Sequence, residues 1–199
     1  MHISEGVLNM PVLVTGFVCA AAGVAIGVKK INADNMPKIA VLSAAFFVAS
    51  LIHVPVGLAS VHLVLNGLIG ILLGWAAFPA IMVSLALQAM LFQFGGITTL
   101  GVNTFNMAFP AVVSFFLFRN MIMTGNKIKT IIAGCMGGIL AIALSAVLVA
   151  LSLAYTDRAF FTPAMVILAA HIPVMVVEGI ITSFCVVFLK TVKPELMEG

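Results

Sequence analysis

Residues 39–118 contain no Asp, Glu, Lys or Arg, and this long uncharged stretch limits what the chain can fold into. Over all 199 residues, 63% are hydrophobic and only 8% are charged. A soluble domain carries about 25% charged residues, because it must keep a wet surface. Lipid is therefore the expected solvent, and the chain is expected to be an integral membrane protein.

The apolar runs are unbroken and do not alternate every second residue. In lipid, backbone polar groups must be satisfied within the protein, which leaves helices or closed barrels, and unbroken runs favour helices. We therefore predict an all-α fold, a helical bundle of about seven transmembrane helices in a single domain over residues 1–199. The predicted helices are 10–28, 37–52, 61–75, 77–95, 104–119, 128–153 and 162–190.

The basic residues predict the orientation of this bundle. With seven spans, only Arg158 falls on one side, and the other eight Lys and Arg residues fall on the opposite side: Lys29, Lys30, Lys38, Arg119, Lys127, Lys129, Lys190 and Lys193. The positive-inside rule then places the C-terminus in the cytoplasm and the N-terminus outside. The expected location is the cell (cytoplasmic) membrane, as a multi-pass protein. The net charge of +3, with no basic run, does not favour nucleic acid as a partner.

The first two residues, Met1 and His2, have the donor atoms for a metal chelate. The start of the chain carries Glu5 where a signal peptide has a positive region, so no cleavage is expected. The Met1 amine, the next backbone nitrogen and His2 Nδ1 can bind one ion in a plane, an arrangement that suits Ni(II) or Cu(II). Another histidine would complete the site. Alternatively, His2 is only the second residue of a frayed terminus.

His62 is one candidate for that further histidine. It lies at the start of a predicted helix that Ser60 could cap, and it shares one face of this helix with Asn66. The alternative is a histidine that is hydrogen-bonded in a polar patch.

Two other histidines fit structural roles better. His53, before Pro55, fits a solvated loop. His171 and Glu178 share one face of the last helix and fit a buried polar pair or a support of the site.

Two segments rich in small residues remain. Residues 94–104 interrupt two spans and could form an ordinary loop or a lid over a cavity; the residues of interest are Gly96, Thr98, Thr99 and Asn103. The first helix has small residues at four-residue spacing, which lets helices approach closely, either within this chain or against a partner. They are Gly16, Ala20, Ala21, Gly23, Ala25 and Gly27.

Taken together, these segments resemble the NikM/CbiM family, the substrate-binding membrane subunits (S components) of energy-coupling-factor transporters for nickel and cobalt. The likeness covers essentially the whole chain. It is carried by Met1-His2-Ile3-Ser4-Glu5-Gly6, the stretch 60–67 with His62, the segment Gly95-Gly96-Ile97-Thr98-Thr99-Leu100-Gly101 with its continuation to Met107, and His171 with Glu178-Gly179.

The resemblance implies that the substrate ion, Ni(II) or Co(II), is coordinated by the Met1 amine, by the backbone and side-chain nitrogens of His2 and by His62, and it implies no cofactor. It implies partners: a transmembrane scaffold (T) subunit, two cytoplasmic ATPases and often a small additional membrane subunit. The small-residue face of the first helix is the expected contact with the scaffold. Leu63-Val64-Leu65 after His62 and the planar nitrogen set favour nickel over cobalt.

Other functions fit the sequence less well. The chain has no Gly-x-x-x-x-Gly-Lys-Ser/Thr loop, so it is not expected to be an enzyme and ATP hydrolysis is expected in the partners. An intramembrane hydrolase would need a nucleophile motif or a zinc-binding histidine pair, and the sequence contains neither. A stand-alone metal channel or secondary transporter would show internal repeats or more intramembrane acids. A vitamin-specific S component would not need a free Met1-His2 start.

Overall fold

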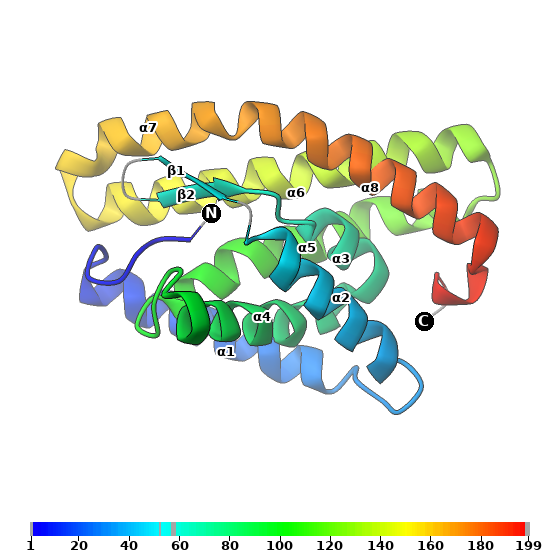
Figure 1. The fold of residues 1–199 in the computed structure, drawn as a ribbon, viewed down its shortest axis with the longest axis horizontal. Helices are drawn as coiled ribbons and strands as arrows, with labels where there is room; N and C mark the ends of the chain where they lie inside the picture. The colour runs from blue at the N-terminus through cyan, green and yellow to red at the C-terminus, as the bar shows by residue number, and fades with distance from the viewer. Residues whose placement is uncertain (1, 52, 57–58, 198–199) are drawn as a thin grey trace.

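The computed structural model describes residues 2–51, 53–56 and 59–197, with only the backbone described at 53–56 and 59–61. The elements are α1 (Met10–Val28), α2 (Met36–Ala49), β1 (His53–Val56), β2 (Ala59–His62), α3 (Asn66–Leu73), α4 (Ala77–Phe92), α5 (Leu100–Met123), α6 (Lys127–Thr156), α7 (Phe161–Ala170) and α8 (Ile172–Val192). Short 3-10 turns lie at Gly74–Ala76, Arg158–Phe160 and Pro194–Leu196. The long helices run side by side and form an elongated bundle (Figure 1).

The predicted helical membrane architecture is confirmed at the level of the bundle. Within the described residues, five helical stretches are long and apolar enough to cross a membrane: Met10–Val28, Asn66–Phe92, Leu100–Met123, Lys127–Thr156 and Arg158–Val192. The helix α2 is apolar but has only 14 residues, a length of about 21 Å. The count of seven transmembrane helices stays a prediction.

The largest difference from the predicted helices is a β-hairpin before α3. The strands β1 and β2 pair antiparallel, with His53 opposite His62, where a helix was predicted to start at residue 61. The β-branched Val54, Val56 and Val61 favour extended backbone, which explains the strands. The prediction that Ser60 caps this helix is wrong, because Ser60 lies in β2 and α3 begins only at Asn66.

The small residues of α1 let this helix pack tightly against its neighbours in the chain. Gly16, Ala20, Gly23 and Gly27 are buried, whereas Ala21 and Ala25 are exposed. A Cβ added at Gly16 would lie 2.8 Å from Val102 Cα, and one at Gly27 would lie 2.4 Å from the Trp75 carbonyl oxygen. The buried stripe therefore joins α1 to α5 and to the turn before α4, which leaves Ala21 and Ala25 on the outer surface.

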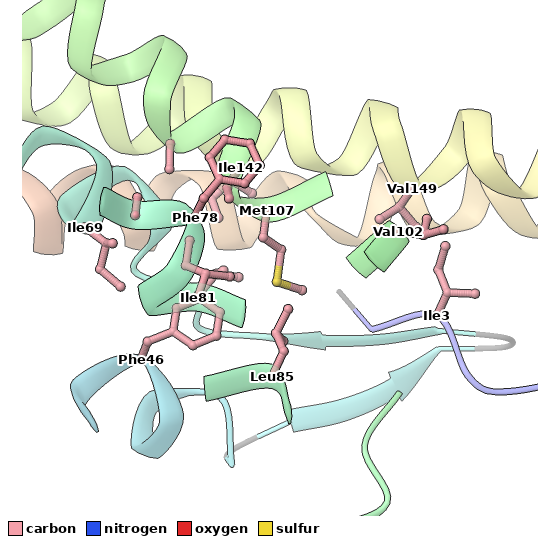
Figure 2. Close-up of a cluster of buried hydrophobic side chains, with 14 of the residues drawn as sticks. Ile3, Phe46, Ile69, Phe78, Ile81, Leu85, Val102, Met107, Ile142 and Val149 are labelled. Atoms are coloured by element: carbon pink, nitrogen blue, oxygen red, sulfur yellow. The ribbon is translucent and has the colours of Figure 1, made fainter. Parts of the chain in front are cut away.

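The main core lies between these helices and extends to the start of the chain. Its fully buried side chains include Phe46, Ile81 and Met107, which come from α2, α4 and α5. Figure 2 shows that Ile3 belongs to the same cluster, beside Val102 and Val149.

The two ends of the bundle differ in charge. The α1–α2 and α5–α6 connections and the C-terminus lie at the right-hand end of Figure 1, and the α6–α7 connection lies at the left-hand end. The eight basic residues predicted to share one side belong to these right-hand segments, and Arg158 follows α6 at the left. The fold thus separates the basic residues between its two ends, and the orientation in the membrane stays a prediction.

Candidate metal centre

The first residues of the chain are held inside the bundle by Asn103 of α5. Its Oδ1 accepts from the Ile3 backbone N–H at 2.9 Å, and its Nδ2 donates to the Ile3 carbonyl at 3.1 Å. The hydroxyl of Thr99 lies 3.1 Å from the same carbonyl. Because the Ile3 side chain is also fully buried, this segment is anchored by both its backbone and its side chain.

The glycine-containing loop before α5 forms the wall against which this segment lies. The backbone N–H of Glu5 donates to the Gly95 carbonyl at 3.1 Å, and Gly95 has φ +79°, which favours glycine. A Cβ at Gly96 would lie 2.6 Å from the Glu5 Cβ, so no side chain fits there unless Glu5 moves. The Thr98 N–H lies 3.4 Å from Glu5 Oε1. The loop therefore contacts the N-terminal segment directly and forms part of its binding surface.

This arrangement places His2 next to His62. The two rings stack with their centroids 4.7 Å apart and an angle of 24° between their planes. Both residues are buried, with 4% of His2 and 3% of His62 exposed. Two imidazoles that the sequence separates by 60 positions therefore share one enclosed site.

The ring of His62 has one hydrogen-bonded nitrogen, Nδ1, and one nitrogen that is left for a ligand, Nε2. Its Nδ1 lies 2.8 Å from the Leu63 carbonyl, so we assign the proton to Nδ1. Its Nε2 is buried and has no hydrogen-bond partner among the described residues. Burial lowers the pKa of His62 well below its usual range. A neutral imidazole with an available Nε2 lone pair is the form that binds a metal ion.

The predicted chelate involves only two side chains, His2 and His62. Met1 lies outside the described residues, so the role of its amine stays a prediction. In the part of the chain that the structure describes, no group of three or more His, Cys, Asp or Glu side chains could hold a metal ion.

The other predicted residues come from several elements of the bundle. Asn66, at the start of α3, donates to Ser145 Oγ at 2.9 Å and so joins α3 to α6. His171 lies between α7 and α8, and its Nδ1 is 2.7 Å from the Ile167 carbonyl. The backbone of His53 is opposite His62, and its side chain lies outside the described ones.

Glu178 reaches the segment that follows His62. Its Oε1 accepts from the backbone N–H groups of Val64 and Leu65, the latter at 2.8 Å. Sequence reasoning paired Glu178 with His171 on one helix face and missed this contact. It also missed Ile3 as an anchor, because a single isoleucine at the start of a chain forms no periodic apolar pattern.

Comparison with known proteins places the chain in a family of metal transport proteins. A family model named CbiM, described as the cobalt uptake substrate-specific transmembrane region, matches residues 2–196. A metal transport protein of Haemophilus influenzae is 40% identical over 199 residues, which cover 99% of this chain and 97% of that protein. A fused nickel transport protein NikMN of Archaeoglobus fulgidus is 29% identical, over 100% of this chain and 68% of that protein.

Solved structures share the fold as well. One described as a transition metal transporter has a TM-score of 0.86 and 28% identity, and the match covers 96% of this chain and 93% of the other. A second, described as a truncated transition metal transporter, has a TM-score of 0.82 and 25% identity, over 96% of this chain and 99% of the other.

Proposed function

Because the chain belongs to the CbiM family and is a membrane component of nickel or cobalt transport, we propose that it is the substrate-binding subunit of an ATP-driven importer of Ni(II). In this proposal the ion is captured at the outer side by the Met1 amine, by the backbone and side-chain nitrogens of His2 and by His62 Nε2. The observation that carries the proposal is the enclosed His2–His62 pair, with ring centroids 4.7 Å apart.

Three features support capture by nitrogen atoms. The N-terminal segment is fixed by Asn103 and by the buried side chain of Ile3, so His2 is held at one position. His62 has a buried Nε2 and a pKa that burial lowers, so its lone pair is available at neutral pH. Three planar nitrogens with an imidazole as the fourth ligand suit the tetragonal preference of Ni(II). This donor set is the reason to propose nickel, with Co(II) as the competing substrate.

Transport requires partners in this proposal. We assign ATP hydrolysis to two cytoplasmic ATPases, coupled through a transmembrane scaffold subunit of the energy-coupling-factor type, with a small additional membrane subunit where one is present. The protein lies in the cytoplasmic membrane with seven spans and its N-terminus outside, and it has no enzymatic activity of its own. The exposed Ala21 and Ala25 on α1 are the part of the small-residue stripe that remains accessible for the scaffold.

The test is metal binding by the purified chain with its native N-terminus in detergent. Ni(II) and Co(II) affinities are measured by competition with a chromogenic chelator. Two changes are compared with the native protein: one extra residue before Met1, and His62→Ala. We expect tight binding of Ni(II) by the native chain, weaker binding of Co(II), and loss of tight binding after either change.

The outcomes separate the alternatives. Equal binding by the chain with a blocked terminus would show that the Met1 amine is not a ligand and would remove the chelate. Tighter binding of Co(II) than of Ni(II) would reverse the substrate assignment. Metal uptake into liposomes by the chain alone would favour a stand-alone transporter.

A further inference from the structure

Glu178 is a fully buried carboxylate on α8 that faces a backbone turn of a distant segment. Its Oε1 accepts hydrogen bonds from two consecutive backbone N–H groups, those of Val64 and Leu65. Consecutive N–H groups that converge on one acceptor oxygen form a nest. The carboxylate therefore fixes the backbone conformation of residues 64–65.

The turn that Glu178 binds needs such support. Leu65 has φ +58° and ψ 14°, in the left-handed region that disfavours a residue with a side chain. Immediately afterwards, α3 begins at Asn66 and packs closely against α6, where a Cβ at Gly67 would lie 2.7 Å from Gly138 Cα. The turn thus lies between a fixed helix and the end of β2, and its conformation sets where β2 ends.

The end of β2 carries His62. The His62 Nδ1 is hydrogen-bonded to the carbonyl of Leu63, the residue that precedes the two N–H groups bound by Glu178. The position of the Leu63 carbonyl selects the tautomer and the orientation of the ring. A continuous series of contacts therefore runs from the Glu178 carboxylate through the turn to His62 Nε2. Groups that orient a metal ligand in this way typically change metal affinity about 10- to 100-fold when they are removed.

We propose that Glu178 is a positioning residue of the metal centre: through the turn at Val64 and Leu65, it holds His62 in the orientation that presents Nε2 to the ion. The proposal rests on the proposed function of His62 as a ligand. It assigns Glu178 no direct contact with the ion.

The test compares Glu178→Met, which removes the oxygen acceptor at similar side-chain length, with the native chain in two measurements. The first is the Ni(II) dissociation constant, which we expect to rise about 10- to 100-fold. The second is ¹⁵N NMR of the metal-free protein with labelled histidine, where the chain's four histidines give few signals. We expect His62 to change from one Nδ1-protonated tautomer to a mixture, and the His171 signals to stay unchanged.

Two further variants make the test specific. Leu65→Gly in the Glu178→Met background should recover most of the affinity, because glycine adopts positive φ without support. Ser183→Ala is the matched control on α8: its hydroxyl donates to the Ile131 carbonyl, away from His62, and its loss should leave the affinity unchanged. If Glu178→Met does not fold, Glu178→Asp, whose shorter side chain moves the oxygen away from the turn, carries the same comparison.

The results that overturn the proposal are distinct. An unchanged affinity in Glu178→Met excludes the positioning role. A weaker affinity with unchanged His62 signals, or one that Leu65→Gly does not recover, means that Glu178 acts in another way, such as direct coordination through Oε2. If the native chain itself does not bind Ni(II), the proposed function fails, and the NMR comparison still tests the effect on the His62 ring.

Discussion

At the scale of single residues, the candidate centre depends on side chains that bind backbone groups. Asn103 satisfies both the N–H and the carbonyl of Ile3 with one amide, in a buried position where each unsatisfied group would cost about 1–3 kcal/mol. Glu178 does the same for the N–H groups after His62. The two histidines are thus positioned through the backbone on either side of the site.

Replacing Asn103 should release the N-terminal segment while the bundle stays folded. In Asn103→Leu, the Ile3 N–H loses its partner and the Ile3 carbonyl keeps only the Thr99 hydroxyl. We expect local opening and at least a tenfold weaker Ni(II) affinity, since tenfold corresponds to about 1.4 kcal/mol. Chelator competition measures the affinity, and hydrogen exchange at residues 2–5 measures the opening. Asn106→Leu is the control, because Asn106, one turn further along α5, donates to Ser152. Equal losses in both variants would contradict this role of Asn103.

The pH dependence of binding follows from protonation of the nitrogens. An α-amine has a reference pKa of about 7.7–8.0, so Ni(II) affinity should fall below about pH 8 by roughly tenfold per pH unit for each proton displaced. Burial lowers the pKa of His62 well below its usual range, so protonation of its ring should compete little with the ion at neutral pH. Affinity measurements and ¹⁵N NMR as the pH is lowered check both statements. A His62 titration centred near its usual pKa would contradict the second.

At the scale of elements, the close packing of the buried glycines of α1 predicts that a larger residue there lowers the stability of the protein. Gly27→Ala places a Cβ 2.4 Å from the Trp75 carbonyl, which is backbone and cannot rotate away. We expect a loss of about 1–3 kcal/mol from overpacking, measured as a lower midpoint of thermal unfolding in detergent. Ala21→Leu, on the exposed side of the same helix, should leave this midpoint unchanged. A stable Gly27→Ala would mean that α1 is not packed against this turn.

The elements also show what a sequence can and cannot predict. The bounds of α1 match the predicted 10–28, because a capping Asn9 and Pro11 mark its start. The hairpin was missed because a short apolar run of β-branched residues fits a strand and a buried helix equally well. The break at His171 was missed although Pro173 follows it, because Pro is also tolerated in the first turn of a continuing helix.

At the scale of the whole molecule, the histidines of the site could be predicted singly, and their proximity could not. His2 was recognisable from its chelating position and His62 from the resemblance. Their stacking depends on Ile3, on the loop at Gly95 and on a turn held from α8, which join segments about 60 to 115 residues apart. No local pattern encodes contacts between segments so distant, since they form only when the bundle is assembled.

The separation of charge between the two ends predicts the orientation in the membrane. Single cysteines are introduced as Lys127→Cys and Arg158→Cys, both at exposed positions, in a background without Cys19, Cys135 and Cys185. A membrane-impermeant maleimide added to intact cells should label the cysteine at 158 and label that at 127 only in opened cells. The reverse pattern would place the His2–His62 end in the cytoplasm and would contradict import from outside.

The buried side chain of Ile3 has a consequence for the rate at which an ion exchanges. Full burial of an isoleucine stabilises the closed segment by about 1.5–3 kcal/mol, so the open form is a minor population. If an ion enters only when this segment lifts, the rate of loading reaches a plateau at high ion concentration, set by the opening step. Dissociation is slowed by the same step. The residence time of the bound ion is then set by the burial of the Ile3 side chain, which is not one of the proposed ligands.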